Sequence, residues 1–171
     1  MNIFILDSHP VTAARYYPDK LCSKISLEIC QMIAVTYSEE FFNWGTLTKK
    51  DGTPYKLSHK NHPCTIWLRE KHENLAWAIT HGLALALEHR RRYNTLPATY
   101  KTLLGAKKIF EKQTGKSLNT FRNVKSFTRA MPDEYKNDKD ITTVSAYRKY
   151  MHTKAYAAWN KLNNVPFWWL K

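Results

Sequence analysis

The sequence predicts a single all-α domain over residues 1–171, a compact helical fold with a short extended N-terminal segment and long loops. Apolar residues recur at helical spacing over three long stretches of the chain. The chain has five Gly and seven Pro, too few for the many turns of a β-sandwich or barrel. Its 171 residues, 43% hydrophobic and 24% charged, suit one hydrophobic core.

The first third of the chain predicts an extended segment followed by a helix. Residues 2–6 are β-branched, aromatic and aliphatic, and Asp7–Pro10 is typical of a turn. A helix is expected from near Pro10 to about Tyr37, with a bend at Pro18. Its second part carries an apolar stripe of Leu21, Ile25, Ile29, Met32, Ile33 and Thr36.

The middle of the chain predicts a loop and then the longest helix. Residues 43–57 contain two glycines and a proline, and Lys49–Gly52 is the expected tip of this loop. The longest helix is expected to follow His62-Pro63, to end near Tyr93 and to be stopped by Asn94–Pro97. Its core face is Leu68, Leu75, Ile79, Leu83 and Ala86.

The last third predicts two further helices. One runs from Pro97 to Gln113 and is closed by Gly115. The stretch 121–131 has no clear period, and Pro132 interrupts it. The final helix is expected over Thr142–Leu162, and the tail 165–171 carries Trp168 and Trp169, so we expect it to pack on the domain.

The charge balance indicates a polyanionic partner. Lys and Arg number 27 against 14 Asp and Glu, a net charge of +13. Clustered cations bind phosphates by releasing counterions, and the six Trp and ten Tyr suit stacking on unpaired bases. A membrane surface would favour one amphipathic helix carrying the charge, but the cations are spread along the chain. We therefore expect DNA or a nucleotide as partner and no membrane; the alternative is a basic surface without such a partner.

The cysteine pattern and the absence of several short motifs exclude several classes of protein. Three irregularly spaced cysteines argue against a disulfide framework and favour a reducing compartment. Cys64 follows two histidines, but no Cys-x-x-Cys pair accompanies it, so we expect no metal and no cofactor. The chain has no Gly-rich phosphate loop and no Gly-x-Ser-x-Gly elbow. Residues 1–6 lack the basic start of a signal peptide.

A polar row on the first helix is the best candidate for chemistry. Lys20, Lys24, Glu28 and Gln31 border the apolar stripe, so Glu28 is expected to be partly buried with Lys24 one turn away. A carboxylate between a core and cations suits proton transfer. The alternative is a Lys24–Glu28 ion pair at the rim.

Two further groups are candidates for binding. On the longest helix Glu70, Asn74, Trp77, His81 and Glu88 share one side, which is either a cleft wall or a solvated face. Before this helix, His59, Lys60 and His62 could contact phosphate together with the free helix N–H groups. The alternative for these histidines is a helix cap. Arg15 and Arg69 are further candidates for binding the substrate or its phosphates.

Three stretches of the chain resemble a known group of proteins. They are Asp19-Lys20 with Lys24 and Glu28, then His59-Lys60-Asn61-His62-Pro63, and Met131-Pro132-Asp133-Glu134-Tyr135. The three together resemble a set of bacteriophage proteins over most of the chain. Residues 1–93 also resemble the small helical pyrimidine-dimer DNA glycosylases of endonuclease V type.

This resemblance implies base excision with backbone cleavage, without metal, in the cytoplasm of an infected bacterial cell. The α-amino group of the chain would attack the sugar C1′, and a helix glutamate, matching Glu28, would assist proton transfer. Met1 and Asn2 are the candidates for the residue that carries this amine. An α-amine has a pKa near 8 and is nucleophilic at neutral pH. A non-catalytic binder of nucleic acid or of a nucleotide, using the same Lys24–Glu28 row and the Trp77/His81 side, is the alternative function.

Overall fold

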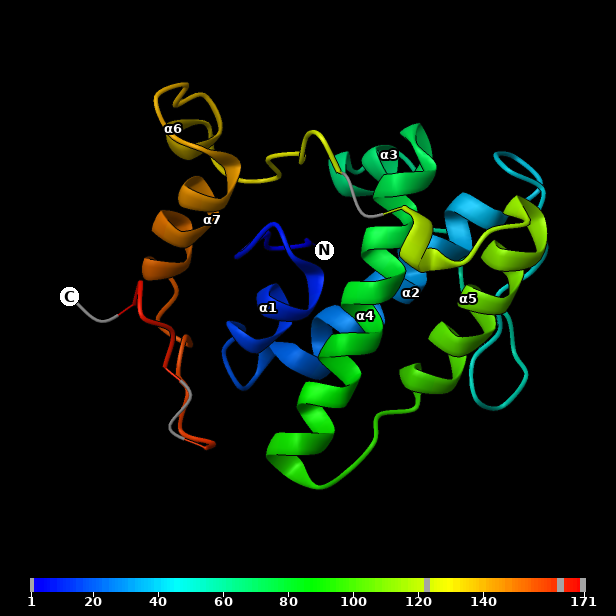
Figure 1. The fold of residues 1–171 in the computed structure, drawn as a ribbon, viewed down its shortest axis with the longest axis horizontal. Helices are drawn as coiled ribbons and strands as arrows, with labels where there is room; N and C mark the ends of the chain where they lie inside the picture. Colours follow the sequence, from blue (N-terminus) through cyan, green and yellow to red (C-terminus); the bar gives the residue numbers. More distant parts are fainter. Residues whose placement is uncertain (1, 122–123, 163–164, 170–171) are drawn as a thin grey trace.

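The all-α fold is confirmed by a computed structural model, which describes residues 2–121, 124–162 and 165–169 (Figure 1). Within these residues the chain forms no β-strand beyond one isolated bridge, between Thr48 and Pro54 in the expected loop. The helices are α1 (Pro10–Arg15), α2 (Leu21–Tyr37), α3 (Pro63–Glu70), α4 (His72–Tyr93), α5 (Thr99–Thr114), η1 (Leu118–Thr120), α6 (Asp133–Lys136) and α7 (Thr143–His152).

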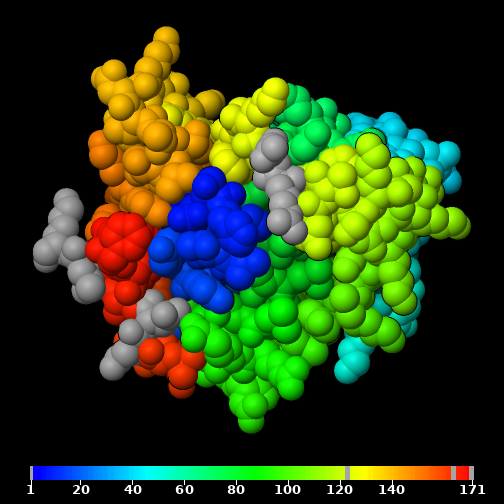
Figure 2. Space-filling view, in the orientation of Figure 1, coloured from blue at the N-terminus to red at the C-terminus, as the bar shows by residue number. Residues whose placement is uncertain are grey.

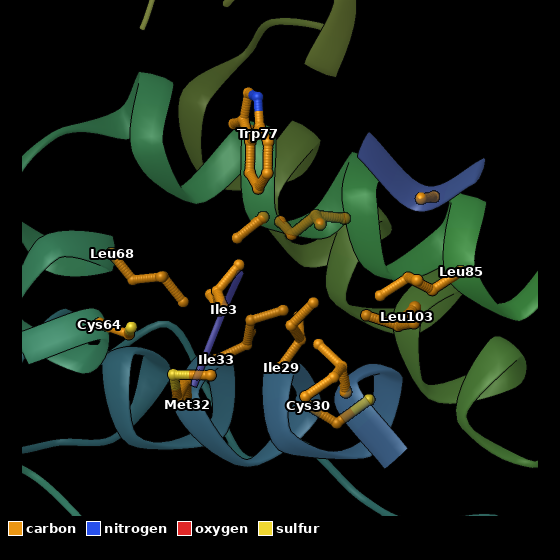
Figure 3. Packing of buried hydrophobic residues seen from close by; sticks show 14 of the residues in the cluster. Ile3, Ile29, Cys30, Met32, Ile33, Cys64, Leu68, Trp77, Leu85 and Leu103 are labelled. Carbon is orange, nitrogen blue, oxygen red and sulfur yellow. The ribbon is translucent and has the colours of Figure 1, made fainter. Parts of the chain in front are cut away.

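The extended N-terminal segment lies inside the fold. Residues 3–6 are buried, and Tyr17 donates from its hydroxyl to the carbonyl of Phe4 over 2.7 Å. Figure 3 shows Ile3 between the α2 side chains Ile29 and Ile33 and the ring of Trp77. Burying four apolar residues stabilises the fold by several kcal/mol, at roughly 1.5–3 kcal/mol for each large side chain. The segment therefore anchors the start of the chain to the core.

The first helix is divided, where the sequence predicted one bent helix. α1 ends at Arg15 and α2 begins at Leu21. Pro18 lacks the N–H of a helical residue, and the carbonyls of Arg15 and Tyr17 accept from the Arg92 guanidinium at 2.9 and 2.7 Å. These carbonyls are thus satisfied outside a helix, which lets the chain turn here.

The longest expected helix is also two helices. Lys71 has extended φ and ψ of −149° and 144°, which separates α3 from α4. The Asn74 side chain donates to the carbonyl of Trp67 over 2.8 Å and so satisfies one acceptor left at the end of α3. Because the Asn74 side chain takes the place of a backbone hydrogen bond, the apolar residues keep their helical spacing across the break. The pattern therefore predicted one continuous helix.

α4 is the central helix and packs against α1, α2, α3 and α5. Gly82 permits the close approach, because a Cβ there would meet Leu103 of α5 at 3.0 Å and Ile29 of α2 at 3.2 Å. With neighbours on several sides, α4 buries much more of its surface than one apolar stripe. This position explains the burial of its polar row described below.

The end of the chain departs most from expectation. α5 ends as predicted at Gly115, whose φ is 65°. α7 stops at His152, about ten residues before the predicted end, and the chain turns back toward α1 and α2. The Trp159 indole donates to the Tyr16 carbonyl over 3.1 Å, an anchor that a helix running on from α7 would lose. The tail packs as expected, since Trp169 stacks on His152 at 4.2 Å.

Candidate functional site

Glu28 lies on α2 beside the N-terminal segment. Its carboxylate is half-buried, as predicted, and its Oε2 accepts from the backbone nitrogen of Asn2 over 2.8 Å. Of the two residues proposed to carry the amine, Met1 lies outside the described residues. The structure therefore brings Glu28 and the nitrogen of Asn2 into direct contact, two groups that the resemblance had placed in one site.

The Asn2 side chain joins three other parts of the fold. Its Nδ2 donates to the carbonyl of Ala130 over 2.6 Å, and its Oδ1 accepts from the Cys64 thiol over 3.6 Å. The Tyr147 hydroxyl lies 3.4 Å from the same Oδ1. Asn2 thus links α2, α3, the segment before α6, and α7. Figure 2 shows the start of the chain, in blue, at the surface between α7, the C-terminal segment and α4.

The site is electrostatically asymmetric. Burial raises the pKa of the Cys64 thiol to about 12, and the Glu28 carboxylate acts in the same direction. Burial also raises the pKa of Tyr156; the Lys154 ammonium opposes this rise, and the Glu28 carboxylate adds to it. The Cys64 thiol and the Tyr156 phenol are therefore neutral at neutral pH and cannot serve as bases there.

The cations of the polar row face solvent. Lys20 and Lys24 are exposed, and among the described residues no ion pair joins Lys24 to Glu28, contrary to the alternative considered above. The segment after α7 contacts the turn just before this row, because Asp19 donates from its backbone to the Ala158 carbonyl over 2.9 Å. In addition, the Lys161 backbone donates to the Asp19 carboxylate over 3.0 Å.

The candidate binding residues in the loop before α3 make contacts within the protein. His62 caps α3, since its Nδ1 accepts from the backbone nitrogen of Cys64 over 3.2 Å, so the capping alternative is confirmed for this histidine. Lys60 forms an ion pair with Glu40. His59 is exposed at a φ of 61°, with its Nδ1 3.0 Å from the Ser58 hydroxyl.

The two added arginines lie on different surfaces. Arg69 donates to the Lys60 carbonyl over 2.7 Å, and its guanidinium lies 4.1 Å above the Phe41 ring. Arg15 is exposed and lines a 710 Å³ cavity between α1 and α4, together with Arg91, Leu83 and Leu87. Neither arginine contacts Glu28 in this structure.

Most of the polar row of the longest expected helix is buried, so the row as a whole is not a solvated face. Trp77 is buried and donates to the Ser8 carbonyl over 2.7 Å, while its ring borders a 560 Å³ cavity that also contacts His9 and Lys125. His81 is fully buried, with Nδ1 2.8 Å from the Pro10 carbonyl. Burial lowers its pKa to about 4. Glu70 belongs to α3 and is exposed.

Four residues around Asn2 and Glu28 could not be assigned to the site from the sequence. Cys64, Tyr147, Ala130 and Tyr156 come from segments 36 to 128 residues away from Glu28, and no spacing rule connects them. The motif that includes Met131 pointed to the correct segment, because the carbonyl of the preceding residue binds Asn2. The other three carried no comparable signal.

The described residues contain no group of three or more His, Cys, Asp or Glu side chains that could hold a metal ion. No helix in that part of the chain is both long and apolar enough to cross a membrane. Comparison of the chain with protein-family models, curated protein sequences and solved structures finds no match. Its function is therefore argued from the site itself.

Proposed function

We propose that the protein is a metal-independent DNA glycosylase/AP lyase, with Glu28 as general acid and base and an N-terminal amine as nucleophile. The 2.8 Å contact between the Asn2 nitrogen and the Glu28 carboxylate carries the proposal. A carboxylate at that distance from an amine can accept a proton from it and return it to a leaving group, whereas from a peptide nitrogen it only accepts a hydrogen bond. The +13 net charge supports a DNA substrate.

The proposed reaction uses only groups of the chain and the substrate. The amine attacks C1′ and forms an imine, while the base or, at an abasic site, water departs. Glu28 then takes a proton from C2′, the electron pair forms the C2′–C3′ double bond, and the 3′ phosphate leaves. In a chain beginning at Asn2 the contacted nitrogen is the nucleophile itself. In a chain that keeps Met1 that nitrogen is a peptide amide.

Borohydride trapping on abasic-site DNA tests this function. The proposal expects a covalent protein–DNA adduct that maps to the first residue of the chain, whose identity intact mass gives. Glu28→Gln is expected to slow strand cleavage by about 10²–10⁴-fold, the usual range for a general acid or base. Glu39→Gln, an exposed glutamate after α2, is the matched control. Absence of an adduct, or cleavage by Glu28→Gln at the wild-type rate, would refute the proposed enzyme activity.

A non-catalytic nucleic-acid or nucleotide binder is the second candidate. It is favoured by the exposed Lys20 and Lys24 beside a nitrogen that is not nucleophilic while Met1 is present. This candidate expects DNA binding without an adduct. A steep fall of affinity with salt indicates DNA, and salt-insensitive binding of one mononucleotide indicates a small ligand.

A further inference from the structure

An aromatic ring stands at the surface just after α7. Tyr156 is 39% exposed, which is high for a large aromatic side chain. Burial raises the pKa of its hydroxyl, the Lys154 ammonium lowers it, and the Glu28 charge raises it. The backbone contacts between Asp19 and residues 158–161 fix the segment that carries this ring.

A lysine next to this ring is held in place without a carboxylate. The Lys154 ammonium lies 3.7 Å from the centre of the Tyr150 ring, and none of the described acidic side chains forms an ion pair with it. Tyr150 in turn stacks near Phe4, with ring centres 6.1 Å apart, and lies 5.5 Å from the ring of Tyr135. A cation–π contact thus positions a positive charge that remains available to an anion.

These features lie on a segment that is held at the turn before α2. Its backbone contacts are with Asp19, and Lys20 and Lys24, which follow Asp19, are exposed. The segment therefore combines an exposed ring, Tyr156, with the positive charge of Lys154 two residues earlier. Grooves that bind single-stranded nucleic acid combine phosphate-binding cations with aromatic rings in the same way.

We infer that Tyr156 and Lys154 form a binding site for an unpaired nucleotide, with the base stacked on the Tyr156 ring and the phosphate contacted by the Lys154 ammonium. The inference rests on the proposed function, which supplies the DNA substrate. It specifies which part of that DNA binds at Tyr156 and Lys154. The π-face of a base is covered in a duplex and becomes free when the nucleotide is unstacked. A single-stranded or locally opened strand is therefore the ligand that the ring fits.

Fluorescence anisotropy with a labelled 15-residue oligo-dT, its duplex with oligo-dA, and heparin tests the site. Heparin supplies the negative charge without bases. Tyr156→Ala is expected to weaken oligo-dT binding about tenfold, a typical loss for one stacked base, and to leave heparin binding unchanged. Tyr156→Phe keeps the ring and is expected to bind oligo-dT like the wild type.

Lys154→Ala is expected to weaken oligo-dT and heparin binding alike, whereas Lys112→Ala, an exposed lysine on α5, is the control that changes neither. Wild-type oligo-dT affinity in Tyr156→Ala, or equal losses for oligo-dT and heparin, would overturn the inference. Trapping separates it from the proposed function: a Tyr156-dependent oligo-dT complex without a borohydride adduct refutes only the lyase. Conversely, if the protein forms the adduct but Tyr156→Ala leaves its oligo-dT affinity unchanged, only this site is refuted.

Discussion

Arg92 donates from Nη1 to the Asp19 carboxylate over 2.9 Å, and this guanidinium is fully buried. The contact joins the end of α4 to the turn before α2. The same side chain donates from Nε to Glu88 over 2.7 Å. Burial opposes the ionisation of Glu88, but hydrogen bonds from Arg91 and Arg92 outweigh it and lower its pKa. A buried cation with two anionic partners holds the two halves of the first predicted helix at their angle.

Removing Arg92 is expected to be strongly destabilising. Arg92→Ala leaves the buried Asp19 carboxylate without its cationic partner and leaves Glu88 paired with Arg91 alone, which costs about 3–5 kcal/mol of unfolding free energy. Urea denaturation measures this loss. Arg90→Ala, an exposed neighbour in the same turn, is expected to change stability by less than about 0.5 kcal/mol. Equal effects of the two substitutions would contradict the assigned role of the buried network.

Stability is expected to fall on acidification because of His81. Its neutral Nδ1–H donates to the Pro10 carbonyl, and its Nε2 is buried without a hydrogen-bond partner among the described residues. The folded pKa of about 4 lies below the usual 6.5, so the unfolded chain takes up the proton first as the pH falls. The free energy of unfolding should decrease by about 2 kcal/mol between pH 7 and pH 5.

The variant His81→Phe is expected to remove most of that pH dependence, because it removes the titrating group. His59→Asn, at an exposed position of positive φ, should retain it. Urea titrations at several pH values measure both. A slope that survives in His81→Phe would assign the acid sensitivity to another group.

The thiols are expected to be unreactive in the folded protein. Burial raises the pKa values of Cys22, Cys30 and Cys64 to about 12, and all three are free. A buried thiol without its thiolate form is a poor nucleophile. Ellman's reagent should label none of the three cysteines in buffer and all three in urea. Rapid labelling of Cys64 under native conditions would show that the contact with Asn2 opens readily.

Asn2→Ala is expected to destabilise the fold by about 1–3 kcal/mol, because it leaves the partly buried Ala130 carbonyl without its donor. Asn119→Ala, at an exposed position of η1, is the control. Hydrogen exchange should show the difference in residues 128–131 and in α7. Unchanged exchange there would mean that Asn2 does not hold these segments.

The lysines of α2 are expected to set the salt dependence of DNA binding. If Lys20 and Lys24 each neutralise one phosphate, each alanine substitution should lower the slope of log affinity against log salt by about 0.7–0.9. The affinity itself should fall for all sequences alike, because phosphate contacts carry no sequence information. A slope equal to that of wild type in Lys20→Ala and Lys24→Ala would place the DNA elsewhere.

Local pattern was sufficient for the fold class, the loop at residues 43–57 and the end of α5 at Gly115. It failed at Pro18 and Lys71, where side chains of Arg92 and Asn74 replace backbone bonds, because the spacing of apolar residues does not show such replacements. The half-buried position of Glu28 followed from its place beside an apolar stripe. The burial of His81 and Arg92 did not follow, because α4 has neighbours on several sides and a one-stripe pattern cannot show this.

Gly82 limits which residues related chains can carry at this position without moving the helices apart. Three helix axes converge where that residue lacks a side chain, and Ile29, the residue after Glu28 on the core side of α2, has one of the first atoms a methyl group would reach. A related chain with alanine or a larger residue there would have to separate these helices. The carboxylate would then shift relative to the N-terminal segment, so a small residue at this position is expected to accompany an intact Glu28–Asn2 contact in any relative.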